Sequence, residues 1–357
     1  MQNVLLASTL HDPNGALLEP LNQAVNVVLS NYRGWVINIT AATDPRIKEL
    51  LKSLENRGVY MTESDLGKPV VSNKIENDHL NVLSGALVIA KNLDINKIQY
   101  TDGDRIIVAA KYFPVDLAEM ARMASEIGDA NSHLNFRRSP EDYFTHPPPL
   151  VQTEFEVNRL YSTVFGITLD VPSTAHVMSR DLVEEVLRRS PQMEPVNFPQ
   201  PKWLIIAKMM GAKIRSVETH NVLTFETAEQ LKARVSEEVA KGKFAKAKEG
   251  EEGAVERSKL QVTDFERNYS LLQQAYMTTF GVASMKNPQE WKLRFGTAGQ
   301  YLTLLLNHLD IFGFNPQQEK NFQEELQSEL ERSLLHLEGR QTAILEALGQ
   351  SGKDIER

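Results

Sequence analysis

Two aspartates separated by one residue carry the strongest chemical signal in this chain. Asp102 and Asp104 flank Gly103, directly after the apolar run 97–101. Carboxylate oxygens are the ligands that hard divalent cations prefer. On a strand that ends at an open crevice, residues i and i+2 point to one face, so both carboxylates could reach one ion and that ion could carry a diphosphate. The alternative is a solvated turn, because a D-x-D pair also arises by chance.

Composition limits the classes of protein to consider. The 357 residues exceed a usual single core and favour two domains. A hydrophobic content of 41% with 24% charged residues is typical of a globular protein, and no apolar run reaches the roughly 18 residues of a membrane helix. The net charge of -8 argues against nucleic-acid binding. We expect a cytoplasmic protein, since residues 1–6 resemble a first strand more than a signal peptide.

The absence of cysteine restricts the chemistry further. The chain contains no cysteine, which excludes disulfides, thiolate metal sites and cysteine nucleophiles. Any metal ion must therefore be bound by oxygen and imidazole ligands.

The first half of the chain alternates β-rich apolar runs with helical patterns, which predicts an α/β fold with a mostly parallel sheet flanked by helices. The expected strands are 4–8, 35–39, 58–61, 98–101, 177–179 and 213–217, and the expected helices are 18–30, one from 44 onward, 78–92, 115–127, 153–165, 181–188 and 203–210. In such sheets, ligands bind in the crevice at the carboxyl ends of the strands. The acidic pair comes directly after the expected strand 98–101, at such an end.

The remainder of the chain predicts a helical extension. We divide the chain into a catalytic domain at 1–232, a charged linker at 233–260 and an all-helical C-terminal domain at 261–357. An apolar stripe that includes Phe322, Leu326 and Leu330 faces either the first domain or a second subunit. Packing against the first domain is the favoured interpretation, and a homodimer through these helices is the other.

Three segments resemble nucleotide-sugar glycosyltransferases with the GT-A fold, of the family 2-like kind. Asp102-Gly103-Asp104 resembles the family's D-x-D, 171–180 its strand before R-x-x-x-E, and 203–214 its W-x-x-x-A-x-x-x-G segment. The resemblance covers roughly residues 3–230. The C-terminal helices are also similar to those of mannosylglycerate-synthase-like enzymes, a retaining group.

The resemblance implies a site for Mg²⁺ or Mn²⁺. Asp104 would bind the ion directly, while Asp102 would contact it through water or hold the ribose hydroxyls, and Gly103 would keep the backbone clear of the ligand. His220, which follows the last expected strand, would be the third metal ligand. The ion would neutralise the charge that develops on the departing diphosphate.

Other residues are candidates for binding the nucleoside-diphosphate-sugar donor. Thr9 lies where related enzymes hold base and ribose, and Asp44 either joins that pocket or caps a helix. Lys68 and Lys74 either meet the diphosphate or are solvated. Arg137, with Arg138, either clamps a phosphate or an anionic acceptor, or pairs with neighbouring carboxylates.

A second polar group of residues is expected on the acceptor side. His146 precedes three prolines in a loop, and Ser173, Thr174 and His176 cluster before an expected strand. These groups either orient an acceptor hydroxyl or serve as turn and capping residues.

One departure from the family affects the mechanism. Inverting relatives carry an acidic base just before the tryptophan helix, but residues 197–202 contain no carboxylate. Either Asp170 or Glu194 supplies the base, or the enzyme is retaining, or activity has been lost. We favour a retaining transferase that acts on a small or lipid-linked hydroxyl acceptor.

Two alternatives to that interpretation remain. A nucleotidyltransferase is disfavoured because only Gly15 lies near the first strand, where a glycine-rich phosphate loop would be needed. An inactive binding or scaffold protein with the same fold is the other alternative, and the missing carboxylate is its best support.

Overall fold

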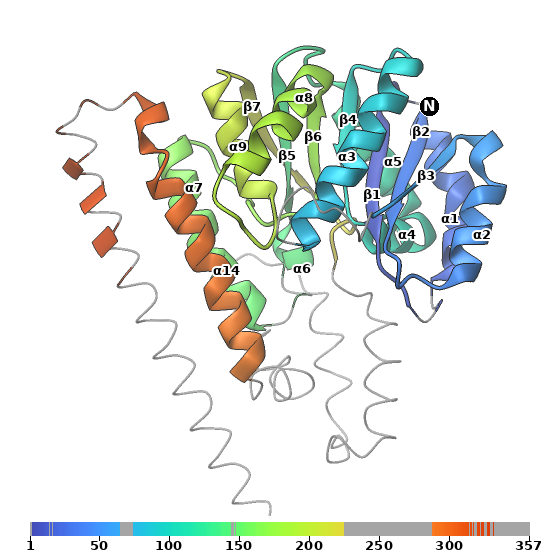
Figure 1. The fold of residues 1–357 in the computed structure, drawn as a ribbon, viewed down its shortest axis with the longest axis horizontal. Helices are drawn as coiled ribbons and strands as arrows, with labels where there is room; N and C mark the ends of the chain where they lie inside the picture. The colour runs from blue at the N-terminus through green and yellow to red at the C-terminus, as the bar shows by residue number, and fades with distance from the viewer. Residues whose placement is uncertain are drawn as a thin grey trace, which may run out of the picture.

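A seven-stranded sheet forms the centre of the molecule (Figure 1). The computed structural model describes residues 2–64 except 14 and 16, 74–224 except 144, 145 and 147, and 288–313, with single positions between 315 and 331. The strands are β1 (Leu5–Leu10), β2 (Gly34–Ile39), β3 (Val59–Glu63), β4 (Lys97–Tyr100), β5 (Ser132–Arg138), β6 (His176–Ser179) and β7 (Lys213–Thr219). Their order is β3-β2-β1-β4-β6-β5-β7, and only β6 runs antiparallel to its neighbours. The expected α/β fold with a mostly parallel sheet is confirmed.

Helices cover both faces of this sheet. One face packs against α1 (Leu18–Asn31), α2 (Pro45–Ser53), α4 (Gly103–Tyr112) and α5 (Pro114–Ser125), and the other against α3 (Lys74–Asn92), α8 (Arg180–Arg189) and α9 (Gln200–Met209). The alternation along β1 explains the two cores: Leu6 joins the first, whereas Leu5 and Ala7 join the second. Because β1 is buried on both faces, its sequence is a nearly continuous apolar run, and that run predicted the strand.

The chain order creates a crevice at one edge of the sheet. After β1 the chain builds β2 and β3 on one side, then returns to β4 on the other side of β1. Strands β1 and β4 are parallel, so their carboxyl ends lie together at this reversal. Ligands of open α/β sheets bind at such points. Thr9 near the end of β1 and Asp102 just after β4 both lie there.

A pair of helices extends the fold beyond β7. The helices α7 (Pro148–Phe165) and α14 (Pro288–Leu306) lie side by side (Figure 1). Together with α9 they bury a third apolar cluster, and the Tyr161 hydroxyl donates to the Tyr301 carbonyl oxygen at 2.7 Å. This part of the C-terminal region therefore packs against the sheet domain. The expected linker at 233–260 lies outside the described residues, and so does most of the apolar stripe after residue 316.

None of the helices in the described ranges combines the length and apolar character that a membrane span requires.

Two elements depart from the sequence-based expectation. Arg137 and Arg138 are the last residues of β5, not part of a loop, and the helix α4 begins directly at the acidic pair. Strand β5 was missed because one of its two buried faces is polar, although Leu134 and Phe136 on the other face join the first apolar core. His133 Nε2 lies 3.1 Å from His176 Nδ1, and Asn135 donates to the Asp170 carbonyl oxygen at 3.0 Å. Buried polar groups paired in this way make a central strand look like a loop in sequence.

A buried ion pair joins α3 to α9. Lys202 Nζ lies 2.5 Å from Glu76 Oε1 and donates to the Ser190 carbonyl oxygen at 3.0 Å. Both charged side chains are fully buried. Burial raises the pKa of Glu76, because the hydrogen bond and charge of Lys202 offset the desolvation of the carboxylate only in part.

We expect Lys202→Met to lower the free energy of unfolding by about 3–5 kcal/mol, because it leaves the Glu76 carboxylate buried without its cation. The double variant Glu76→Leu/Lys202→Met should recover part of that loss. Urea unfolding at pH 7.5 measures the free energy of unfolding of the single and the double variant. The control Lys91→Met breaks an exposed pair with Glu184 and should cost at most about 1 kcal/mol. A double variant as unstable as the sum of its single changes would contradict this account.

Candidate functional site

The acidic pair lies at the start of a helix. Strand β4 ends at Tyr100, Asp102 is the N-cap residue of α4, and Asp104 is the second residue of that helix. The two carboxylates are therefore not alternate residues of a strand, as one interpretation of the sequence assumed. Asp102 is half-buried and Asp104 is exposed. The positive end of the helix dipole lies beside both, which favours anionic groups at this position.

Gly103 allows α4 to begin against β1. A Cβ at this position would lie 2.9 Å from the Thr9 carbonyl oxygen. That distance is shorter than real Cβ contacts and would force the helix away from the strand. Gly103 is therefore needed for close packing of backbone on backbone, and its expected role toward a ligand stays a prediction.

Tyr100 holds Asp102 in place. Its buried hydroxyl donates to Asp102 Oδ1 at 2.6 Å and lies 2.8 Å from Thr9 Oγ1. The His79 ring packs 4.8 Å from the Tyr100 ring, and the Trp203 ring lies edge-on at 5.3 Å. Aromatic packing fixes the tyrosine, which in turn fixes the carboxylate.

The electrostatics of the pair favour a cation. Burial, followed by the charge of Asp104, raises the pKa of Asp102 to about 7, although the Tyr100 hydroxyl and the Arg105 charge act in the opposite direction. Two carboxylates that repel each other at the edge of a crevice are stabilised by a bound divalent ion. The donor set of two carboxylates therefore fits Mg²⁺ or Mn²⁺, with further oxygens to come from a ligand or water.

A cavity of about 420 Å³ opens beside the pair at the carboxyl ends of β1 and β4. It is lined by Thr9, Leu10, His11, Leu17, Thr40, Lys74, Ile75, Asp78, His79, Asp102, Asp104 and Phe198. Its volume is within the range of small-molecule sites. Thr9 and Lys74, both predicted to bind the donor, line this cavity.

A second, smaller cavity of about 160 Å³ lies on the other side of Asp102. Its charged lining consists of three arginines and two carboxylates, Arg105, Arg138, Arg294, Asp102 and Glu154, and Glu154 is paired with Arg138. His146, Tyr301 and apolar side chains from α7 and α14 complete the lining. Burial and then the charges of Arg138 and Arg105 hold the pKa of His146 well below its ordinary value. This imidazole is therefore neutral at physiological pH, and the field around it is positive.

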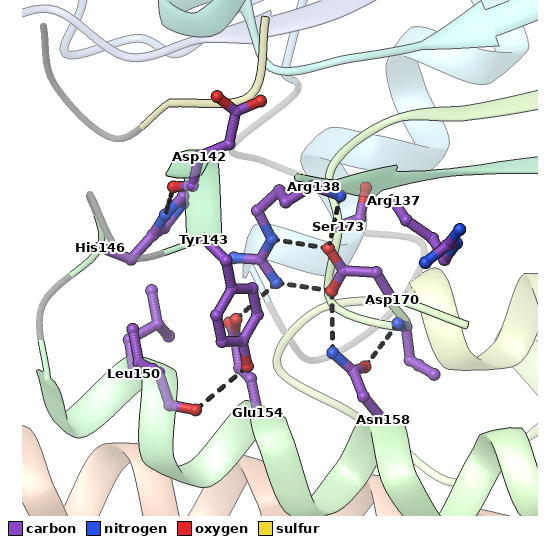
Figure 2. Close-up of polar contacts among 12 residues, drawn as sticks. Arg137, Arg138, Asp142, Tyr143, His146, Leu150, Glu154, Asn158, Asp170 and Ser173 are labelled. Carbon is purple, nitrogen blue, oxygen red and sulfur yellow. Dashed lines mark hydrogen bonds and ion pairs between the residues drawn. The ribbon is translucent and has the colours of Figure 1, made fainter. Parts of the chain in front are cut away.

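Arg138 forms a buried network with acidic residues (Figure 2). It donates to both Asp170 oxygens, at 2.7 and 2.6 Å, and to Glu154 at 2.7 Å, while Asn158 donates to Asp170 at 3.0 Å. Burial alone would raise the pKa of Asp170, but Arg138 outweighs it and lowers the pKa. Asp170 thus fixes an arginine at the second cavity, and its own carboxylate does not line either of the two cavities.

Among the other predicted donor and catalytic residues, Asp44 and Glu194 line neither of the two cavities. The Asp44 side chain accepts from the Arg46 backbone N–H at 2.8 Å, so it caps α2, the alternative expected from the sequence. Glu194 is exposed and accepts from Asn307 at 3.0 Å. Lys68 lies outside the described residues.

His220 does not meet the acidic pair. Its ring is 62% exposed and lies 3.9 Å from Glu218 Oε1, and Arg137 lies 3.6 Å from the same carboxylate. The segment after β7 does return to the pair, because Leu223 lines the second cavity with Asp102 and the Thr224 carbonyl oxygen accepts from Arg105 Nη1 at 2.7 Å. The His220 side chain lies beside Glu218 and is open to solvent instead. In the described part of the chain no group of three or more His, Cys, Asp or Glu side chains is arranged to hold a metal ion. The expected third ligand is therefore not provided by His220 in this arrangement.

Several site residues were not predicted from the sequence. His79 and Phe198 line the first cavity, and Arg105 and Arg294 line the second. Arg105 follows Asp104 directly in the sequence, and this position next to the acidic pair could have indicated it. Arg294 comes from α14, and no spacing in the sequence connects it to the sheet.

Among known proteins, only solved structures are similar to this chain. No protein-family model and no curated protein matches the chain. Among solved structures, glucosyl-3-phosphoglycerate synthase from Mycobacterium tuberculosis in complex with UDP is 11% identical over 77% of this chain and 80% of that chain, with a TM-score of 0.39. The same synthase with Mn²⁺, UDP-glucose and phosphoglyceric acid is 9% identical over 61% and 70%, with a TM-score of 0.38.

A third complex of that synthase, with Mn²⁺, UDP and phosphoglyceric acid, is 11% identical over 61% of this chain and 69% of that chain, with a TM-score of 0.40. Identities near one tenth leave the function to be argued from this chain's own residues.

We expect Asp102→Asn to stabilise the metal-free protein at pH 8 by on the order of 1–2 kcal/mol, and to lose this advantage near pH 5. A carboxyl whose pKa is raised to about 7 binds its proton more tightly in the folded state. The wild-type protein therefore loses stability as pH rises from about 4 to 7, whereas the variant does not.

Urea unfolding in EDTA at both pH values measures this difference. Asp94→Asn, at a 94% exposed side chain before β4, is the matched control. If the stability difference between Asp102→Asn and wild type were the same at pH 5 and pH 8, the pKa of Asp102 would not be raised by burial and by Asp104 as described.

Proposed function

We propose that this protein is a metal-dependent glycosyltransferase that moves a sugar from a nucleoside-diphosphate-sugar to a hydroxyl acceptor. One observation carries the proposal: an electrostatically strained pair of carboxylates lies at the carboxyl edge of the sheet, where a larger cavity and a smaller basic cavity meet. Such an arrangement can hold a donor on one side and an acceptor on the other.

The larger cavity is the proposed donor site. Asp104 and Asp102 would hold Mg²⁺ or Mn²⁺, which when bound neutralises charge on the leaving diphosphate. Tyr100 keeps Asp102 oriented, and Lys74 at the start of α3 adds a positive charge to the same cavity. Thr9 supplies a hydroxyl from β1.

The smaller cavity is the proposed acceptor site, and its chemistry supports a small anionic acceptor. Arg105 and Arg294 line it together with Arg138, whose guanidinium is fixed by Asp170 and Glu154. A volume of about 160 Å³ suits a short hydroxy acid or its phosphate better than a lipid chain. Arginines bind carboxylate and phosphate through paired hydrogen bonds.

Retention of anomeric configuration is part of the proposal. Residues 197–202, where inverting relatives carry their acidic base, contain no carboxylate, and the residue of this segment that lines both cavities is the apolar Phe198. The two carboxylates expected as bases, Asp170 and Glu194, make other contacts. An inverting reaction needs a base beside the acceptor hydroxyl, whereas front-face transfer with retention does not require one at this position.

We expect UDP-glucose, or another nucleotide sugar in a panel that includes GDP-mannose, to raise the melting temperature by several degrees only when Mn²⁺ is present. Asp104→Asn should abolish the Mn²⁺-dependent part of the shift, because the ion loses its exposed carboxylate ligand. Asp94→Asn is the matched control and should keep the full shift. If no nucleotide sugar changes the melting temperature, the interpretation as a binding or scaffold protein replaces this proposal.

We expect D-glycerate or 3-phosphoglycerate to accelerate UDP release from UDP-glucose, and neutral glycerol to have little effect. Arg294→Gln should raise the KM for the active acid by about tenfold or more, with donor KM and kcat within about twofold, because a charge-assisted hydrogen bond is worth about 1.5–3 kcal/mol. Arg159→Gln, on α7 and 39% exposed, is the control. Equal acceleration by glycerol and the acids would contradict an anionic acceptor.

A further inference from the structure

Phe198 lies at the junction of the two cavities. Among the described residues, only Asp102 and Phe198 line both. The two residues differ in chemistry, because one is a carboxylate suited to a metal ion and the other is an apolar ring. If the donor and acceptor bind as proposed, the new bond forms beside this ring.

The backbone around Phe198 is held on both sides. The Asn197 backbone N–H donates to Gln300 Oε1 at 2.9 Å, and its side chain donates to Thr297 Oγ1 at 2.7 Å, both on α14. On the other side, Pro199 is the N-cap residue of α9, and its carbonyl accepts from the Lys202 N–H at 2.9 Å. The ring itself is half-buried against the apolar cluster of α7, α9 and α14. The hydrogen bonds of the flanking backbone and the packing of the ring therefore hold Phe198 in place where it lines both cavities.

An apolar wall at a reacting bond affects the competition between acceptor and water. Water beside a phenyl ring finds no hydrogen-bond partner there, so the ring disfavours an ordered water near the sugar carbon. The sugar is activated for transfer as the diphosphate leaves, and any water at that position would intercept it. The second cavity, with its arginines, still admits an anionic acceptor.

We propose that Phe198 determines the choice of transfer over hydrolysis by excluding water from the junction of the two cavities. This inference rests on the proposed function. In the excluded side reaction, the water oxygen forms a bond to the anomeric carbon. The bond from that carbon to the diphosphate oxygen breaks with its electron pair leaving on the nucleoside diphosphate, and a water proton passes to solvent. The products are the free sugar and the nucleoside diphosphate.

The test compares Phe198→Ala with Phe198→Leu and wild type. Free glucose and UDP are measured from UDP-glucose with Mn²⁺, without acceptor and then with 3-phosphoglycerate. We expect Phe198→Ala to raise the ratio of hydrolysis to transfer by about tenfold or more, equivalent to about 1.4 kcal/mol in relative barriers. Phe198→Leu retains a smaller apolar side chain and should raise the ratio by about two- to threefold.

The controls separate this role from a structural one and from the proposed function itself. Phe155→Ala removes a ring that is 40% exposed on α7 and should leave the ratio unchanged. Melting temperatures identify any variant that fails to fold, and Phe198→Leu then carries the test through a smaller rise of the same sign. An unchanged ratio in folded Phe198 variants overturns this inference alone. A wild-type protein that releases UDP from no nucleotide sugar overturns both proposals.

Discussion

The burial of the Asp102 carboxylate beside the charge of Asp104 is the constraint on which the site depends. Burial and the neighbouring charge raise the pKa of Asp102 to about 7, so the folded protein keeps an unfavourable arrangement at the edge of its sheet. The fold maintains it through Gly103, which lets α4 begin against β1, and Tyr100, whose hydroxyl orients the carboxylate. Strain of this kind is commonly retained where a ligand relieves it.

The rest of the molecule builds two compartments around that pair. Strands β1 and β4 and the first turn of α3 form the larger compartment, while α7 and α14 close the smaller one. The buried pair of Glu76 and Lys202 connects the α3 wall to α9, whose N-terminus carries Phe198. The C-terminal helix α14 therefore contributes to the site directly, through Arg294 and through the contacts that hold Asn197.

Much of the sheet was predictable, because β1 and β2 are buried along almost their whole length and carry mostly apolar residues. Strand β5 was not, because His133 and Asn135 satisfy their polar groups against partners far along the chain. The acidic pair was predicted but its helical setting was not, since three residues cannot distinguish a strand end from an N-cap. His220 was expected to be a metal ligand, but its exposed ring lies beside Glu218, an orientation that its place after the last strand does not reveal. Arg294 and Phe198 depend on tertiary packing that no local pattern records.

Anomalous diffraction at the manganese edge from crystals soaked with Mn²⁺ and UDP tests the central claim most directly. The account predicts one strong peak within about 2.0–2.6 Å of an Asp104 carboxylate oxygen, with the Asp102 side chain in the same coordination sphere or one water away, and the diphosphate on the ion. UDP bound in the larger cavity with no manganese beside the pair, or manganese bound elsewhere, would contradict it.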